Sequence, residues 1–167
     1  NTDTSASLYE KLANLGPTAL VETLELMAQP NYKADDHNIA QDNELATYAK
    51  KLDKAEAELN WQLSASELHR KIRAYIPWPV SQFTFTESEN KEHKIRVWQA
   101  SVQDYQGNAA LGTIIHVDKQ GIVVATTEGA LRLEVIQLPG KKALPVKDLL
   151  NGRSDWFVVG SPINKLG

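Results

Sequence analysis

Lysine and arginine side chains that could bind phosphate gather in four short clusters along this chain. An ammonium or guanidinium group neutralises phosphate, and the planar guanidinium fork can hold two oxygens at once. Each cluster alone is more often a solvated surface, but the four together favour an anionic partner. The clusters are Lys50, Lys51 and Lys54; Arg70, Lys71 and Arg73; Lys91, Lys94 and Arg96; and Lys141 and Lys142.

Residues for metal binding or covalent catalysis show no such grouping. No two histidines stand four apart with a glutamate between them, and the chain has no cysteine, which excludes thiolate metal sites and disulfides. It also lacks a glycine-rich phosphate loop and a Gly-x-Ser-x-Gly turn. We therefore expect no catalytic residue, no metal and no cofactor in this segment. The histidines, expected to be solvated or hydrogen-bonded, are His37, His69, His93 and His116.

Charge divides the 167 residues into two unlike parts. Residues 1–49 carry a net charge of −6 and residues 50–167 a net charge of +3, with 42% hydrophobic residues over the whole chain. That composition is typical of a globular protein. No apolar run is long enough to cross a membrane, and the lack of cysteine and of a signal peptide fits the cytoplasm. The polar amino terminus without methionine leads us to expect a piece of a longer protein.

The second basic cluster lies on a predicted helix over residues 64–76. Ser64 and Glu67 have the spacing of a capping box, which starts a helix, and Pro77 must stop it. One face is apolar and another is basic, so the helix is expected to pack on a core and expose guanidinium groups. The apolar stripe is Leu68, Ile72, Tyr75 and Ile76, and Arg70 and Arg73 share the other face.

Residues 1–28 are predicted to form two helices separated at Gly16-Pro17. Ser7 and Glu10 have capping-box spacing, and proline suits the first turn of a following helix. The polar, acidic stretch over residues 29–46 has no periodicity and is predicted to be a linker.

Beyond Pro79 the period changes to that of strands. Alternating or β-branched stretches, separated by turn-like Lys119-Gln120-Gly121 and Thr127-Glu128-Gly129, predict an α+β fold with a small antiparallel β-barrel. A short helix over residues 146–150, opened by Pro145 and stopped at Asn151-Gly152, should flank it. The predicted strands cover residues 83–85, 95–97, 113–117, 122–126 and 131–135.

Trp78 stands between two prolines and allows two interpretations. It could stack on a base, as aromatic side chains do in proteins that bind single strands. The favoured interpretation is a wedge that fixes the helix to the barrel, and the same is expected of Trp61, Trp98 and Trp156.

In order and spacing, several of these motifs resemble the carboxy-terminal part of methionyl-tRNA formyltransferases. The resemblance covers nearly the whole chain. The residues that carry it are Ser7-Leu8-Tyr9, Leu15-Gly16-Pro17, the stretch from Thr47 to Leu52, Asn60-Trp61, Pro77-Trp78-Pro79, the stretch from Gly121 to Ala125, Gly140-Lys141-Lys142 and Trp156-Phe157.

The resemblance implies a division of labour. Residues 1–28 would be a helical remnant of a Rossmann-like catalytic domain, residues 29–46 a linker, and residues 47–167 a carboxy-terminal domain like the oligonucleotide-binding (OB) barrel. The whole enzyme, a cytoplasmic monomer, would transfer a formyl group from 10-formyltetrahydrofolate to methionyl-initiator tRNA. The family's catalytic Asn, His and Asp map to no position here, and Asp3 is given no such role. The residues expected to contact tRNA phosphates are Lys50, Lys51, Lys54, Arg70, Lys71, Arg73, Lys141 and Lys142.

Two alternatives remain open from the sequence. The chain could be the corresponding part of a formyltransferase that uses a sugar nucleotide or folate metabolite, which would need no basic docking surface. It could instead be a non-catalytic protein-interaction module that docks through Leu8, Leu12 and Leu20.

Overall fold

A computed structural model describes residues 2–87 and 91–164 of the chain. These residues form two compact units, which are treated separately here. One unit is Ala6–Leu52, and the other consists of the remaining described residues, 2–5 and 53–164. The predicted roles of residues 1–28, 29–46 and 47–167 remain predictions.

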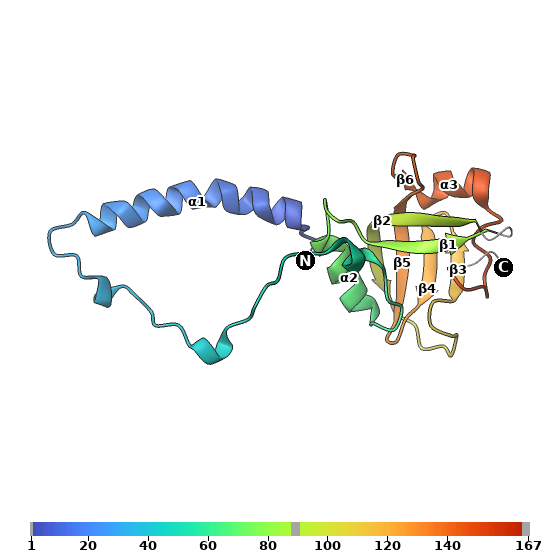
Figure 1. Cartoon of the computed structure of the whole chain (residues 1–167), viewed down its shortest axis with the longest axis horizontal. Helices are drawn as coiled ribbons and strands as arrows, with labels where there is room; N and C mark the ends of the chain where they lie inside the picture. The colour runs from blue at the N-terminus through green and yellow to red at the C-terminus, as the bar shows by residue number, and fades with distance from the viewer. Residues whose placement is uncertain (1, 88–90, 165–167) are drawn as a thin grey trace. The chain divides into compact units, whose positions relative to one another are not determined.

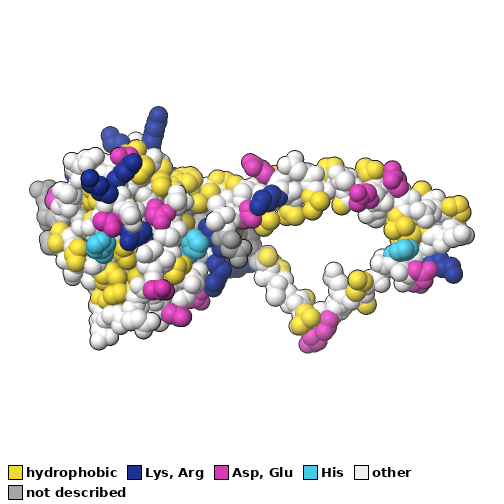
Figure 2. Space-filling model, turned by 180° about the vertical axis from the view of Figure 1, so that it is seen from behind, with side chains coloured by type: hydrophobic (Ala, Val, Ile, Leu, Met, Phe, Trp, Pro, Cys, Tyr) yellow, Lys and Arg dark blue, Asp and Glu magenta, His cyan; other side chains and the backbone are white. Residues whose placement is uncertain are grey.

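The first unit is dominated by one long helix, α1 (Ser5–Met27). A break at Gly16-Pro17 was expected, and this prediction is wrong because the helix runs through Pro17. The residue before a proline avoids the helical region largely because its own Cβ meets the proline ring, and Gly16 has no Cβ. The helix also begins before Ser7, so Ser7 is not its cap. Large apolar side chains are exposed along α1, as Figure 2 shows.

Only short turns of 3-10 helix follow α1 in the described part of this unit. They are η1 (Ala34–Asp36) and η2 (Asn43–Leu45). The Asp42 carboxylate caps η2 by accepting a hydrogen bond of 2.9 Å from the Glu44 backbone N–H. The polar segment over residues 29–46 thus has little regular structure.

The second unit is built on a curled, antiparallel half-barrel sheet with packed helices, which confirms the predicted α+β class (Figure 1). The strand order is β1-β2-β5-β4-β3, and β6 pairs with β5. The likeness to an OB barrel stays a prediction. The strands are β1 (Gln82–Thr86), β2 (Glu92–Gln103), β3 (Ile114–Asp118), β4 (Gly121–Ala125), β5 (Ala130–Gln137) and β6 (Leu144–Pro145).

The helix α2 (Ala65–Ala74) begins as the sequence predicts. The Ser64 hydroxyl accepts from the Glu67 N–H at 3.2 Å, and the Glu67 carboxylate accepts from the Ser64 N–H at 2.9 Å. The helix ends at Ala74, earlier than residue 76, and the N–H of Ile76 donates at 3.4 Å to the Arg73 carbonyl, three residues back, in place of the Ile72 carbonyl that would continue the helix. Pro77 then restricts Ile76 to a non-helical conformation.

Two further helical segments flank the sheet, η3 (Lys54–Ala57) and α3 (Val146–Arg153). A stop at Asn151-Gly152 was expected for α3, and the structure contradicts it. Glycine ends a helix when it takes the left-handed conformation. Gly152 does not take it, so α3 continues to Arg153, whose guanidinium lies 4.6 Å from the Trp156 ring centroid.

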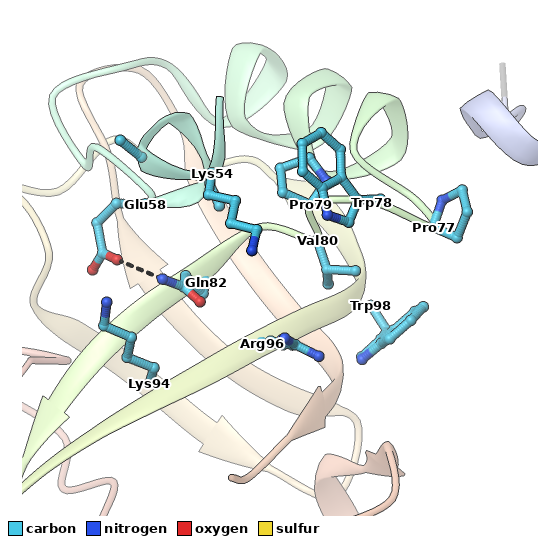
Figure 3. A pocket seen from close by; sticks show the side chains of 12 residues that line it. Lys54, Glu58, Pro77, Trp78, Pro79, Val80, Gln82, Lys94, Arg96 and Trp98 are labelled. Carbon is cyan, nitrogen blue, oxygen red and sulfur yellow. Dashed lines mark hydrogen bonds between the residues drawn. The ribbon is translucent and has the colours of Figure 1, made fainter. Parts of the chain in front are cut away.

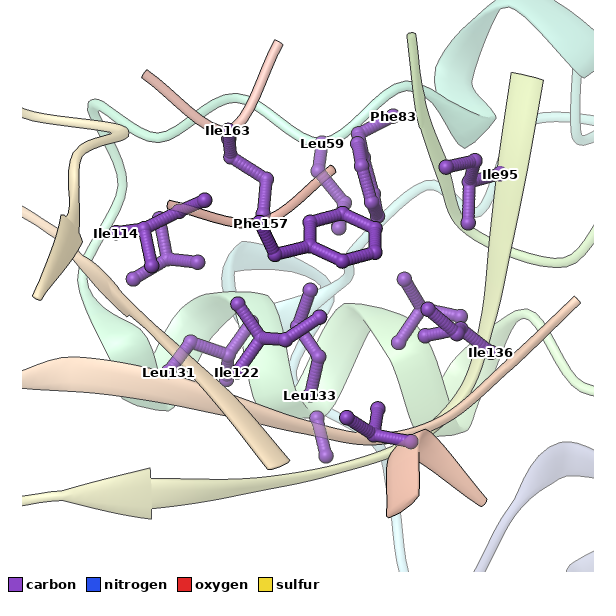
Figure 4. Packing of buried hydrophobic residues seen from close by; sticks show 14 of the residues in the cluster. Leu59, Phe83, Ile95, Ile114, Ile122, Leu131, Leu133, Ile136, Phe157 and Ile163 are labelled. Atoms are coloured by element: carbon purple, nitrogen blue, oxygen red, sulfur yellow. The ribbon is translucent and has the colours of Figure 1, made fainter. Parts of the chain in front are cut away.

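One apolar core lies inside the curl of the sheet (Figure 4). The alternation of β1 sends Phe83 and Phe85 inward, where Phe85 stacks on Trp156 with ring centroids 4.6 Å apart. The apolar stripe of α2 covers the core through Leu68 and Ile72, both fully buried. Burial of each such side chain contributes about 1.5–3 kcal/mol.

The Asp118 carboxylate stabilises the β3–β4 turn. Its Oδ1 accepts from the backbone N–H groups of Gln120 at 2.8 Å and Gly121 at 3.0 Å. The same oxygen accepts from Nη1 of Arg132 on β5, at 2.9 Å. The turn predicted at residues 119–121 is therefore held both within itself and to the neighbouring strand.

We predict that Gly121→Ala lowers the free energy of unfolding by about 1–3 kcal/mol, the usual cost of forcing atoms into a packed site. A Cβ there would lie 2.4 Å from the Leu133 carbonyl oxygen. Urea unfolding measures the change. Gly152→Ala is the control, because no atom lies within 4 Å of its Cβ position. Alanine in α3 should leave stability unchanged or raise it by up to about 1 kcal/mol. Equal effects of the two substitutions would contradict this packing.

The capping box of α2 predicts a pH-dependent contribution from Glu67. Hydrogen bonds from the Ser64 hydroxyl and the Ser64 backbone N–H hold the pKa of Glu67 below its ordinary value of 4.5. A depressed carboxyl pKa stabilises the fold above the unfolded-state value, and this is lost as the pH falls through the folded-state value. Glu67→Gln should therefore be less stable than the parent at pH 7, with the difference shrinking below about pH 4.5. Thermal unfolding across this range would contradict the assignment if the difference were constant.

Candidate nucleic-acid interface

The side chains of strand β2 alternate between the two faces of the sheet. Ile95 and Val97 are fully buried in the core, whereas Lys94 and Arg96, each directly before one of them, are exposed. Successive side chains of a strand point to opposite faces, so both cations lie on the outer face of the half-barrel. Because Ile95 and Val97 point into the core, Lys94 and Arg96 point into solvent.

A β-bulge lies in β2 at Trp98, the residue that follows these cations on the same face. Val97 pairs with Ile136 and Gln99 with Val135, which leaves Trp98 as an extra residue without a partner on β5. A bulge shifts the alternation by one, so burial passes from Val97 to Ala100. Trp98 thus extends the outer row of Lys94 and Arg96.

These side chains line an open pocket of about 490 Å³, called here the tryptophan pocket (Figure 3). One wall is the outer face of β1 and β2, and the opposite wall is η3 and the Pro-Trp-Pro segment that follows α2. Three of its side chains are cations and one is an anion. The lining residues are Lys54, Ala55, Ala57, Glu58, Pro77, Trp78, Pro79, Val80, Gln82, Lys94, Arg96 and Trp98.

The Glu58 carboxylate in this pocket is already hydrogen-bonded. It accepts from the Gln82 amide at 3.4 Å and from the Thr84 hydroxyl at 3.1 Å. Since Lys54, Lys94 and Arg96 outnumber this single carboxylate, the pocket carries a net positive charge. The pocket can therefore attract an anion while also offering an amide and a carboxylate as hydrogen-bonding groups.

The Pro-Trp-Pro segment holds its tryptophan outside the core. Trp78 is 49% exposed and is absent from the buried cluster that contains Trp61 and Trp156. Trp61 and Trp156 are thus core residues, whereas Trp78 lines a pocket, and the predicted role of these tryptophans as wedges between helix and barrel stays a prediction. The peptide bonds before Pro77 and Pro79 are both cis.

Val80, which follows this segment, has a positive φ of 63°. This is a rare conformation for a β-branched residue and costs about 1–2 kcal/mol. It is held by the burial of the Val80 side chain and by a hydrogen bond of 2.9 Å from the Val80 N–H to the Tyr75 carbonyl. The chain therefore turns sharply between the end of α2 and the start of β1.

A second hollow, of about 270 Å³, shares Gln82, Lys94 and Arg96 with the tryptophan pocket. It continues to Gly140 at the end of the loop after β5. Gln137 links the two regions, because its Oε1 accepts from the Trp98 indole N–H at 2.8 Å and its Nε2 donates to the Lys141 carbonyl at 2.8 Å. The two hollows together form a basic groove across the outer face of the sheet.

Comparison with known proteins identifies the family. A match to the family described as "Formyl transferase, C-terminal domain" covers residues 51–154. The chain belongs to this family. It is also 81% identical, over all 167 residues, to a methionyl-tRNA formyltransferase of Colwellia psychrerythraea strain 34H. The chain spans about half of that relative, 51% of its length.

Solved structures show the same fold at much lower identity. A variant of HypX from Aquifex aeolicus matches 91% of this chain and 26% of its own, with a TM-score of 0.58 and 15% identity. HypX in complex with tetrahydrofolic acid matches 90% of this chain and 25% of its own, with a TM-score of 0.57 and 15% identity. At this identity the likeness concerns the fold of this formyltransferase domain alone.

The cations predicted to bind phosphate fall into separate places. Lys54 lies in the tryptophan pocket. Lys141 and Lys142 line another hollow, of about 320 Å³, together with Arg153. Lys50 and Lys51 belong to the other unit. The structure thus places one of these five cations in the groove and two near its Gly140 end.

On α2, two of the three predicted cations make internal contacts. Lys71 donates from Nζ to the Glu58 carbonyl at 2.8 Å, and Arg73 donates from Nη1 to the Asp3 carbonyl at 2.7 Å. Both are partly buried, and burial lowers the pKa of Lys71 against the opposing effect of nearby glutamates. Arg70 is exposed. Among the three cations of this cluster, Arg70 is the one that is exposed to solvent, as expected of a residue that binds phosphate.

The groove contains residues that were not among those assigned to tRNA. Lys94 and Arg96 were noted in one basic cluster with Lys91, and Trp98 was expected to be a wedge that fixes the helix to the barrel. The alternation Lys94-Ile95-Arg96-Val97-Trp98 could have placed all three on one face of a strand. Their meeting with Lys54, 40 to 44 residues earlier, and with Trp78, 16 to 20 residues earlier, could not be read from that alternation.

Two other kinds of feature are absent from residues 2–87 and 91–164. That part of the chain contains no cluster of three or more histidine, aspartate or glutamate side chains arranged to hold a metal ion. Its helices also include none with both the length and the apolarity needed to cross a membrane.

We predict that Lys71→Met lowers the free energy of unfolding by about 1 kcal/mol, because it removes a charged donor from the Glu58 carbonyl while keeping the apolar stem. Arg70→Met on the same helix is the matched control and should leave stability unchanged. Urea unfolding of both variants gives the comparison. A larger loss for Arg70→Met would show that the roles of the two cations are reversed.

Proposed function

We propose that this chain is the tRNA-binding portion of a methionyl-tRNA formyltransferase. The observation that carries the proposal is the 81% identity, maintained over the full length of the chain, with the Colwellia enzyme. The basic groove supports it from the chemistry of its side chains. Lysine and arginine bind nucleic acid mainly by neutralising phosphates and releasing counterions, which carries little sequence information.

The groove suggests which residues take part. Lys54, Lys94 and Arg96 surround one pocket, and Lys141 and Lys142 follow the loop at its far end. Arg70, Lys50 and Lys51 remain proposed contacts of the wider surface. Lys71 and Arg73 bind backbone carbonyls, so we assign them first to the attachment of α2 and the amino-terminal residues.

The activity proposed for the whole protein is formyl transfer from 10-formyltetrahydrofolate to the amino group of methionyl-initiator tRNA, in the cytoplasm and as a monomer. The catalytic residues are proposed to lie outside this chain, in the part of the relative that the chain does not match. The folate donor is proposed to bind there as well. This chain would hold the tRNA so that its acceptor end reaches that part.

We predict that the chain binds initiator tRNA with an affinity that falls steeply with salt. The double substitution Lys94→Ala and Arg96→Ala should weaken binding and reduce the slope of log K against log salt by about 1.8, since each phosphate contact contributes about 0.9. The loss should be alike for unrelated tRNAs. Filter binding over a series of KCl concentrations measures both quantities.

Lys119→Ala is the control for this measurement. Lys119 is equally exposed but lies on the β3–β4 turn, outside the groove, and should change the slope little. Salt-independent binding, or no binding, would sink the proposal. Formyl transfer by the whole protein to a sugar nucleotide in place of methionyl-tRNA would favour the alternative enzyme class.

A further inference from the structure

We propose that the tryptophan pocket binds one unstacked RNA base, with the face of Trp78 as the stacking surface. The groove would then bind the base of one nucleotide in a single strand, in addition to binding phosphates through its cations. This inference rests on the proposed RNA binding and specifies the kind of RNA structure that this part of the groove accepts.

The exposure of Trp78 is the first observation. Large aromatic side chains usually bury their area in the core, as Trp61 and Trp156 do here. Trp78 instead is 49% exposed to solvent and lines a pocket of about 490 Å³, within the usual size range of small-molecule sites. An exposed indole of this kind can stack on any base, because every base has an aromatic face.

The second observation is the mixture of groups around that indole. Lys54, Lys94 and Arg96 supply positive charge for a phosphate, while the Gln82 amide and the Glu58 carboxylate supply a donor and acceptors. Figure 3 shows these side chains arranged around the same space as Trp78. A nucleotide combines an aromatic ring, a hydrogen-bonding edge and an anionic phosphate. A sugar lacks the aromatic ring and the charge, and a phosphate alone leaves the indole without a stacking partner.

The third observation is that the backbone presents Trp78 in a constrained loop. Pro77 and Pro79 flank it with fixed φ angles, and Val80 directly after them has a positive φ. Strained residues of this kind concentrate at ligand sites, where the surrounding structure holds them in place. A stacking surface that is already ordered loses little conformational entropy when the base arrives.

The fourth observation is that the pocket opens along the groove. Its residues Gln82, Lys94 and Arg96 also line the adjoining hollow, which ends near Gly140. A strand with one base on Trp78 could therefore pass its next phosphates along β2. The charged row of the sheet and the stacking residue would bind adjacent parts of one single-stranded segment.

The test compares two RNAs, a single strand of about twelve nucleotides, in the range that one small barrel domain covers, and a blunt duplex of the same length. We expect Trp78→Ala and Trp78→Leu to weaken single-strand binding about tenfold, and Trp78→Phe to keep most of the affinity. All three should bind the duplex like the parent, because the phosphate contacts are unchanged. Tyr9→Ala, which removes an exposed aromatic ring outside the pocket, is the control and should alter neither affinity.

The leucine variant separates stacking from packing, since leucine fills space but has no aromatic face. Parent-like binding by Trp78→Leu, or an equal loss for single strand and duplex, would overturn the stacking proposal and leave the proposed tRNA binding standing. Failure of the parent chain to bind either RNA in a salt-dependent manner would overturn both. Urea unfolding of each variant verifies that the fold is kept, and Trp78→Phe provides the comparison if Trp78→Ala unfolds.

Discussion

The pairing of β2 with β1 on one side and β5 on the other is the constraint on which the rest of this domain depends. Burial of Ile95 and Val97 fixes which face of β2 turns inward, because a slip of one residue would place them in water and the charges in the core. The outward direction of Lys94 and Arg96 is a consequence of that burial. The same pairing includes the bulge at Trp98, after which burial passes to Ala100.

The junction between α2 and β1 completes the groove from the other side. Leu68 and Ile72 anchor α2 on the core, and Lys71 ties it to the backbone at Glu58. The chain then turns at the Pro-Trp-Pro segment, which places Trp78 over the outer face of β2 rather than within the core. Lysine and arginine residues that look equivalent in the sequence therefore have different roles. Some donate hydrogen bonds to backbone carbonyls, and others face solvent.

Local signals predicted the elements well where they do not depend on distant residues. The capping box of Ser64 and Glu67 and the turn at Gly121 form from neighbours in sequence, and the structure contains both. The predicted stops at Gly16-Pro17 and at Asn151-Gly152 are wrong. Proline and glycine only bias a backbone, and a helix can continue where the preceding residue has no Cβ or where glycine keeps helical angles.

The sequence by itself determined the α+β class, the positions of β1 to β5, the start of α2 and the family resemblance, because capping, alternation and motif order depend on adjacent residues. It missed the short β6 and most of the length of β2. The tertiary structure alone decided which charges share a site. Lys54, Trp78 and Arg96 line one pocket because the half-barrel and the turn after α2 bring them together. Lys71 and Arg73 are no longer candidates for binding phosphate, because they donate hydrogen bonds to carbonyls elsewhere in the fold. Those outcomes depend on packing between distant segments, which no local spacing encodes.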